Sequence, residues 1–213
     1  YLVSAGALET HDYDCLLKLL PTDGSVRIDK VTTQYGVLVL AGPRSREVLA
    51  KVTKADVSNK AFPWLTARPI SIGAAGVIAM RVNFIGELGY EIHHPIEMQN
   101  YIFDRLMAAG AEFGIKPFGI RAMDSLRLEK SYKLVGRELS IEYELGRFVD
   151  FNKDFLGKDA LLKWRDKGFA NKLVTLELSG VVEFDARGSE PVYKDGVAVG
   201  RTTSGGYGWR TGK

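Results

Sequence analysis

The feature that most constrains the fold is a pair of alternating stretches, residues 77–84 and 88–94, joined by a glycine-bearing turn. Apolar side chains occupy every second position of the first stretch. In the second stretch, Glu91 and His93 share the face opposite the mainly apolar one. A period of two is typical of β-strands, and glycine gives the connecting backbone the freedom that a turn requires. The sequence therefore predicts a β-hairpin that carries a carboxylate in its second strand.

Two interpretations of this hairpin are open from its residues alone. Phe84 and Glu91 can approach each other if the turn twists or bulges. An aromatic ring beside a carboxylate can hold a flat heterocycle that donates two N–H groups. The alternative is a surface hairpin with a solvated glutamate, because exposed carboxylates are the rule in folded proteins.

Five segments of the chain resemble, in order, those of the folate-dependent aminomethyltransferases. This family includes the glycine-cleavage T-protein and the C-terminal folate domains of dimethylglycine and sarcosine dehydrogenases. The segment Phe84-Ile-Gly-Glu-Leu-Gly-Tyr-Glu91 is similar to the family's Tyr-x-Gly-Glu-x-Gly-x-Glu segment. The other segments are residues 35–44, 117–130, 154–161 and 199–207. The residues at 121–130 and 203–207 resemble those of the dehydrogenase-attached domains more than those of the free T-protein.

The resemblance implies an α+β fold in which mixed or antiparallel sheets pack against helices, followed by the start of a small β-barrel domain. Residues 1–167 correspond to the folate-binding domain, whose N-terminal part we expect to be missing. Residues 168–213 correspond to an incomplete C-terminal barrel. Strand and helix patterns also mix along the chain without regular βαβ alternation, which favours α+β.

The activity implied by the resemblance is tetrahydrofolate-dependent one-carbon transfer, in which a folate nitrogen captures the methylene group of an amine. Glu91 matches the glutamate that pairs with the pterin, Phe84 stands where relatives usually have tyrosine, and Tyr90 is a candidate wall of the slot. The expected partners are tetrahydrofolate, an amine substrate and a fused or associated flavin dehydrogenase, with FAD only on that other domain. The family's catalytic aspartate lies on a strand before Tyr1, so we expect no catalytic residue in this chain.

The chain departs from the family pattern at two places. Met123 occupies the position of a ligand-contacting arginine in T-proteins, and the region 140–147 is several residues shorter than in relatives. Asp124 and Arg127, three positions apart on a predicted helix, are explained by an ion pair. These departures keep two alternatives open: a non-catalytic folate-binding or regulatory module, and a folate-dependent O- or S-demethylase.

Composition excludes several other classes of protein. A net charge of +3 over 213 residues gives no footprint for nucleic acid or a membrane surface, and no apolar run is long enough to span a bilayer. A single cysteine, Cys15, indicates a reducing compartment, which we expect to be the cytoplasm or the mitochondrial matrix. His11, His93 and His94 lack the spacing of metal ligands, so we expect no metal site.

Periodicity and turn residues predict the remaining elements. Helices are expected at residues 8–20, 43–54, 95–113, 120–130 and 159–167. Further strands are expected at residues 1–5, 25–33, 36–40, 67–72, 173–178, 191–193 and 197–203. The continuous Val/Leu run at 36–40 favours a central strand buried on both faces. Asp195-Gly196 predicts a tight hairpin turn near the end of the chain.

Overall fold

The computed structural model describes residues 1–134, 138, 145–180 and 186–213. It divides into two compact units. The first unit comprises Tyr1–Val82 and Gly89–Ile115, and the second unit comprises Asn83–Leu88 and Lys116–Lys213. The loop Asn83–Leu88 therefore belongs to the second unit, although it connects two strands of the first.

The expected helices are confirmed, with ends that shift by a few residues. They are α1 (Glu9–Lys18), α2 (Ser45–Val52), α3 (Gln99–Gly110), α4 (Ile120–Glu129) and α5 (Lys158–Lys167). Short 3-10 helices lie at Gly6–Leu8, Thr32–Gln34, Ile96–Met98, Ala111–Phe113 and Leu145–Phe148. Among the described residues, no helix has the length and apolarity that crossing a membrane requires.

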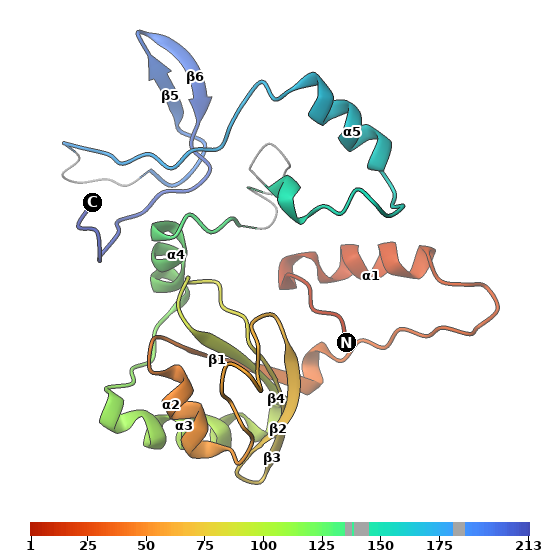
Figure 1. Ribbon diagram of the computed structural model, residues 1–213, viewed down its shortest axis with the longest axis vertical. Helices are drawn as coiled ribbons and strands as arrows, with labels where there is room; N and C mark the ends of the chain where they lie inside the picture. Colours follow the sequence, from red (N-terminus) through yellow and green to blue (C-terminus); the bar gives the residue numbers. More distant parts are fainter. Residues whose placement is uncertain (135–137, 139–144, 181–185) are drawn as a thin grey trace. The chain divides into compact units, whose positions relative to one another are not determined.

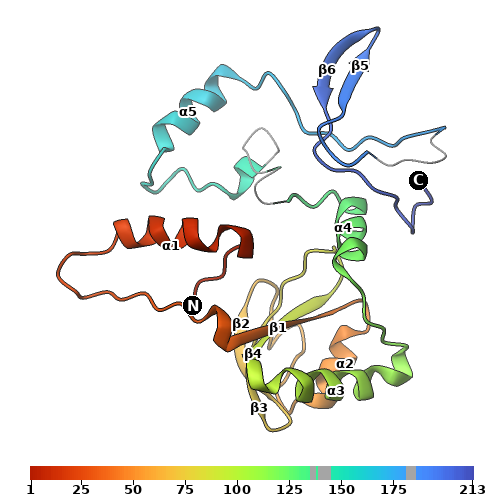
Figure 2. The same cartoon turned by 180° about the vertical axis from the view of Figure 1, so that it is seen from behind.

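The first unit is built on a four-stranded antiparallel sheet. Its strands, in chain order, are β1 (Tyr35–Ala41), β2 (Ala67–Ile72), β3 (Ala75–Met80) and β4 (Gly89–Pro95), and their spatial order is β1-β4-β3-β2. The helices α2 and α3 lie side by side against one face (Figures 1 and 2). That face supplies the core, with Leu40, Val77, Ala79, Tyr90 and Ile92 from the strands and Leu49, Ile102 and Leu106 from the helices. The predicted α+β architecture is confirmed.

The prediction of a central strand at residues 36–40 is wrong. A strand forms there, but β1 lies at the edge of the sheet, next to β4. Leu40 points to the helices and is buried, whereas Val37 and Val39 on the other face are exposed. A continuous apolar run predicts burial on both faces. Because Val37 and Val39 are exposed instead, they form an open apolar strip on β1, beside β4.

The predicted hairpin of β3 and β4 is confirmed, and Met80 lies opposite Glu91 in its register. The first strand ends at Met80, earlier than the alternating pattern suggests. Beyond it, the side-chain oxygen of Asn83 accepts a hydrogen bond from the backbone N–H of Ile85 at 2.7 Å. Gly86 follows with a φ of +72°. A side-chain turn and a left-handed glycine both lead the chain away from an extended conformation.

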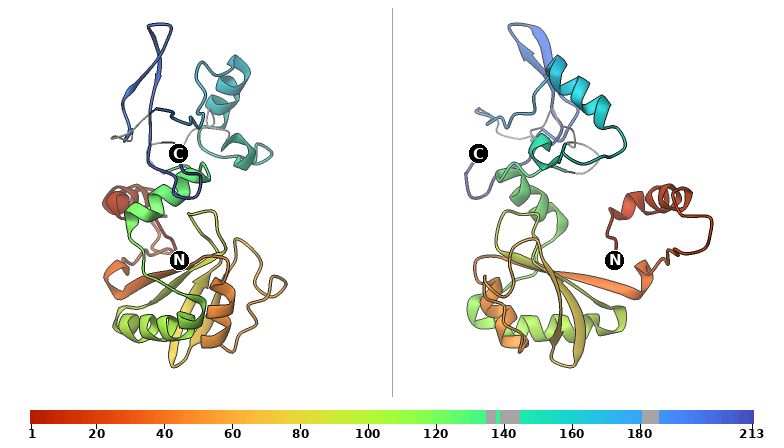
Figure 3. Two further views of the ribbon diagram at one scale, coloured as in Figure 1. Left: turned by 90° about the vertical axis from the view of Figure 1, so that its left-hand side faces the viewer. Right: turned by 45° about the vertical axis from the view of Figure 1, so that its right-hand side comes forward.

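The second unit contains α4, α5 and the two-stranded sheet of β5 (Pro191–Lys194) and β6 (Val197–Arg201), shown from two sides in Figure 3. The predicted turn between these strands is confirmed. Asp195 and Gly196 have φ values of +51° and +77°. Two successive positive φ values are typical of a type I′ turn, whose twist matches that of the flanking strands.

Three other predicted strands, residues 1–5, 25–33 and 173–178, do not form strands in the described structure. Residues 25–33 and 173–178 alternate in part between apolar and polar side chains, but alternation does not provide a neighbouring strand to satisfy the backbone N–H and C=O groups. Val26 and Val174 are exposed accordingly. These segments were predicted from their residues alone, but none of them pairs with a neighbouring strand.

Candidate functional site

Glu91 lies on β4, an interior strand of the sheet, and its side chain is on the face away from α2 and α3. Its neighbours in register are Val39 on β1 and Met80 on β3. The Glu91 side chain is 31% exposed, so it is neither fully solvated nor sealed in the core. A carboxylate flanked by apolar side chains on a sheet is a surface on which a flat ring with N–H donors can lie.

His93 lies two residues further along β4 and therefore on the same face. Its Nε2 is 3.4 Å from Oε2 of Glu91, and its Nδ1 is 3.1 Å from the hydroxyl of Tyr1. The ring of Tyr1 meets the imidazole edge-on, and it also contacts the ring of Tyr35. Burial, and secondarily the nearby Tyr35, raise the pKa of the Tyr1 phenol. Within the described part of the chain, His93 is the one hydrogen-bond partner of the Glu91 carboxylate.

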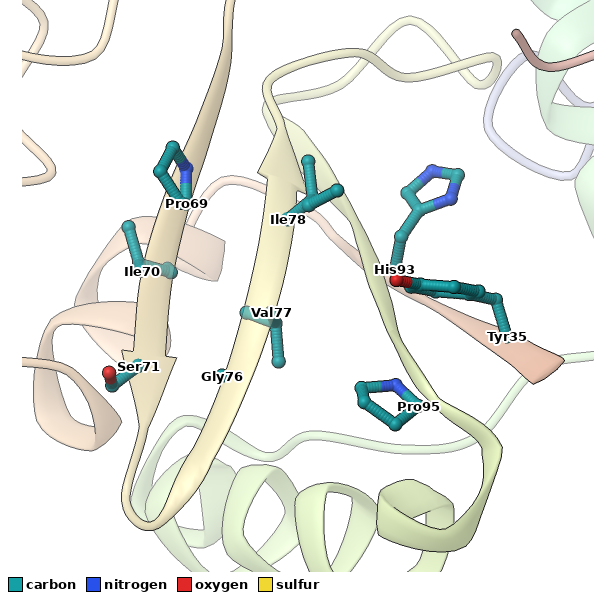
Figure 4. Close-up of a pocket in the computed structure, with 9 residues that line it drawn as sticks. All are labelled: Tyr35, Pro69, Ile70, Ser71, Gly76, Val77, Ile78, His93 and Pro95. Atoms are coloured by element: carbon teal, nitrogen blue, oxygen red, sulfur yellow. The ribbon is translucent and has the colours of Figure 1, made fainter. Parts of the chain in front are cut away.

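A shallow hollow of about 420 Å³ opens beside this histidine on the same sheet face. Figure 4 shows His93 and Tyr35 on one side of the hollow, Ile78 on the neighbouring strand β3, and Pro95 at the end of β4. The remaining lining residues are Pro69, Ile70, Ser71, Gly76 and Val77. The lining is mainly apolar, so the hollow extends the apolar strip beside Glu91.

Tyr90, the second residue predicted to line the site, points to the opposite face from Glu91. It is fully buried, its ring lies 5.5 Å from that of Phe62, and its hydroxyl accepts a hydrogen bond from Nε of Arg46 at 3.3 Å. The structure therefore does not bring Tyr90 and Glu91 together. Alternation along a strand separates neighbouring residues in this way.

Phe84, the predicted stacking residue, lies in the second unit on the loop Asn83–Leu88. Its ring centroid is 6.5 Å from that of Tyr132. On the same loop, Glu87 accepts a hydrogen bond from Arg210 at 2.6 Å. The loop is thus anchored within the second unit by an aromatic contact and an ion pair.

The second unit holds a buried ion pair that the sequence did not indicate. Arg127 of α4 is 1% exposed, and its Nη1 lies 3.1 Å from Oε2 of Glu138, which is 3% exposed. The predicted ion pair of Arg127 with Asp124 is confirmed, with Nε 2.7 Å from Oδ1. Nη2 of Arg127 also donates to the hydroxyl of Ser204 at 2.7 Å.

Donors surround Glu138 on both oxygens. The hydroxyls of Thr203 and Ser204 each donate to Oε1 at 2.7 Å, and the backbone N–H of Leu134 donates to Oε2 at 2.8 Å. Burial by itself would raise the pKa of Glu138. These hydrogen bonds and the positive charge of Arg127 outweigh that effect and lower the pKa. A carboxylate satisfied in this way is held ionised and fixes the segment 203–204 against α4.

Other candidate residues carry less chemistry. His94 is buried and hydrogen-bonded to the carbonyl of Ile92 and to Gln99, which identifies it as a packing residue. The described residues include no group of three or more His, Cys, Asp and Glu side chains that could hold a metal ion. Met123 lies on α4 as expected. Residues 140–144, most of the shortened region, fall outside the described residues.

Comparison with known families gives two matches that together cover most of the chain. The GCVT N-terminal domain matches residues 1–153. The glycine cleavage T-protein C-terminal barrel domain matches residues 171–213. These matches confirm the family resemblance carried by the five sequence segments.

Curated relatives agree with the family matches. The chain is 37% identical to the mitochondrial dimethylglycine dehydrogenase of Mus musculus, over 97% of this chain and 24% of that protein. It is 31% identical to the mitochondrial pyruvate dehydrogenase phosphatase regulatory subunit of Mus musculus, over 97% of this chain and 25% of that protein. It is 34% identical to the aminomethyltransferase of Caldanaerobacter subterraneus, over 84% of this chain and 49% of that protein. The chain thus spans about a quarter of the first two relatives and about half of the third.

Proposed function

Because this chain belongs to the glycine cleavage T-protein family, we propose that it is a tetrahydrofolate-dependent one-carbon transferase domain, of the kind attached to dimethylglycine and sarcosine dehydrogenases. The family and its aminomethyltransferases depend on folate. The observation that carries the proposal for this chain is Glu91, a carboxylate placed on an interior strand between apolar neighbours. One of its oxygens, Oε1, has no hydrogen-bond partner among the described residues.

The pteridine ring of a folate has the chemistry that this arrangement accepts. It is flat, and it presents adjacent N–H groups that a carboxylate can pair with through two charge-assisted hydrogen bonds. Val39 and Met80 flank Glu91 in register and offer apolar contact to the ring. In the proposed site the Glu91 carboxylate sets the register of the ring. When bound, the folate supplies the nitrogen that captures the one-carbon group.

The proposed partner follows from the relatives. Dimethylglycine dehydrogenase is about four times longer than the matched region, since the alignment covers 24% of it. We propose that a flavin dehydrogenase, fused or associated, delivers the methylene group of an amine to this domain, and that FAD is bound there. The mitochondrial relatives favour the matrix as its location in a eukaryotic cell.

Thermal unfolding with and without tetrahydrofolate tests the binding proposal. At about a hundredfold excess over the dissociation constant, the ligand should add ~2.7 kcal/mol to the free energy of unfolding. Glu91→Gln removes the negative charge with little change in shape and should abolish this stabilisation. Glu97→Gln, an exposed residue of the same unit, is the matched control and should keep it. A wild-type melting temperature that does not move with saturating tetrahydrofolate contradicts the proposal.

A second candidate function is a regulatory module that retains folate binding without chemistry. The similarity to the pyruvate dehydrogenase phosphatase regulatory subunit over 97% of this chain favours it, as does Met123 in place of arginine. An assay of formaldehyde capture from demethylated glycines, with a dehydrogenase supplied, separates the two. Folate binding without methylenetetrahydrofolate formation would support the regulatory function. Methyl in place of methylene folate as product would indicate the demethylase alternative.

A further inference from the structure

We propose that His93 is a positioning residue that holds the Glu91 carboxylate in the orientation in which it receives its ligand. The inference rests on the proposed function, because it assigns His93 a role at the same site. It concerns a hydrogen-bonded chain of three side chains on one face of the sheet. The hydroxyl of Tyr1 meets Nδ1 of His93 at 3.1 Å, and Nε2 of His93 meets Oε2 of Glu91 at 3.4 Å.

The carboxylate of Glu91 sets the direction of the hydrogen bonds among these three side chains. A carboxylate only accepts hydrogen bonds, so an Nε2 lone pair facing Oε2 would be repelled by it. The favourable neutral tautomer of His93 therefore carries its proton on Nε2 and presents a lone pair at Nδ1. The phenol of Tyr1 carries an O–H donor and can donate to that lone pair. Tyr1 thus donates to His93, and His93 donates to Glu91.

Packing keeps the imidazole in place. The His93 side chain is 1% exposed, and its strand neighbours in register are Val37 and Ile78, both apolar. The ring of Tyr1 meets it edge-on at a centroid distance of 5.5 Å. A buried ring with no polar groups among its strand neighbours gains most by keeping the Glu91 contact. Glu91 by contrast is 31% exposed, and among the described residues only His93 hydrogen-bonds its carboxylate.

The consequence for binding is directional. His93 engages Oε2, which leaves Oε1 and the remaining lone pairs of Oε2 for the ligand. A carboxylate held by a hydrogen bond to a fixed ring loses less rotational freedom when a ligand binds. Positioning partners of this kind act through the residue that they hold and do not touch the ligand. His93 should therefore change the affinity for tetrahydrofolate without contributing a direct contact.

Two substitutions separate positioning from packing. The amide nitrogen of glutamine reaches about the place of Nε2 and that of asparagine about the place of Nδ1, so His93→Gln keeps the donor toward Glu91 and His93→Asn does not. We expect His93→Asn to raise the dissociation constant of tetrahydrofolate about tenfold. His93→Gln should stay within about twofold of wild type. Tyr1→Phe, a change at an exposed residue, should raise the constant about threefold and serves if both histidine variants fail to fold.

The measurement is calorimetric titration of the full 213-residue chain with tetrahydrofolate kept reduced, alongside thermal unfolding without ligand. Equal affinities for His93→Asn and His93→Gln, or an unchanged affinity for Tyr1→Phe where neither folds, overturn the positioning role. The proposed function fails separately, if Glu91→Gln binds as tightly as wild type. A loss with Glu91→Gln, a loss with His93→Asn and rescue with His93→Gln together support both.

Discussion

Glu91 and Glu138 are both partnered carboxylates, yet their surroundings differ in nearly every respect. Glu138 in the second unit is 3% exposed and accepts hydrogen bonds from two hydroxyls, one backbone N–H and Arg127. Glu91 in the first unit is 31% exposed and has one contact, at 3.4 Å, among the described residues. Glu138 has used its capacity to accept hydrogen bonds, whereas Glu91 has most of that capacity left.

The comparison shows how to distinguish a structural charge from a binding charge. A buried charge is tolerated when its partners replace the lost water, and the group then has nothing left to offer a ligand. A half-exposed carboxylate with spare lone pairs and apolar neighbours exchanges water for a ligand at lower cost. Glu138 should therefore matter to stability and Glu91 to binding.

The largest effect is expected for Arg127→Met. Removing one partner leaves Glu138 buried without its countercharge, which typically costs about 3–5 kcal/mol of unfolding free energy. Urea unfolding measures the loss. Arg121→Met on the exposed face of the same helix is the control and should change stability by less than about 0.5 kcal/mol. Equal stability of the two variants would show that the buried pair is not a structural charge.

The same substitution at the two glutamates should give opposite results. Glu138→Gln keeps the shape but replaces acceptors by an NH₂ group near donors, and it should cost about 1–3 kcal/mol of unfolding free energy. Its affinity for tetrahydrofolate should stay close to wild type. Glu91→Gln should alter stability by no more than about 0.5 kcal/mol and abolish folate binding. Urea unfolding and calorimetry on the same two samples provide the check, and a reversal of either result breaks the comparison.

The pH dependence of stability sharpens the structural half of the comparison. The folded-state pKa of Glu138 lies below its ordinary value of 4.5. A depressed pKa means that the unfolded chain takes up this proton first, so the stabilisation is fully present above about pH 4.5 and is lost as the pH falls through the folded-state pKa. The difference in urea midpoint between wild type and Glu138→Gln should therefore shrink below that pH. A difference that stays constant down to about pH 3 would contradict this account.

Local signals in the sequence were sufficient for the elements that local chemistry determines. Asp195-Gly196 predicted the β5–β6 hairpin because few residues tolerate two positive φ values. Alternation placed Glu91 and His93 on one face. Alternation failed at residues 25–33, where no partner strand is available, and the continuous Val/Leu run wrongly assigned residues 36–40 to the interior of the sheet. Whether an apolar strand is central or at an edge depends on neighbours that its own residues do not encode.

The two carboxylates could be predicted to different degrees for the same reason. Glu91 stood out through its hairpin and through the family segment that contains it. Alternation predicted that His93 shares its face. The contact between the two side chains and the contribution of Tyr1 were not predicted, and 92 positions separate Tyr1 from His93. Arg127 showed its local pair with Asp124, whereas Ser204 lies 77 positions away. Long-range polar contacts leave no periodic trace in a sequence, so the buried pair became visible only in the folded chain.

The smallest effect is expected at Tyr90, and it tests whether this residue belongs to the ligand site around Glu91. Tyr90→Phe removes the hydrogen bond from Arg46 and keeps the packing against Phe62, so it should cost about 1 kcal/mol of unfolding free energy. Because Tyr90 points away from Glu91, the affinity for tetrahydrofolate should not change. Thermal unfolding and calorimetry on this variant measure both quantities. A weakened folate affinity at unchanged stability would instead place Tyr90 in the wall of the ligand site and extend that site through the sheet.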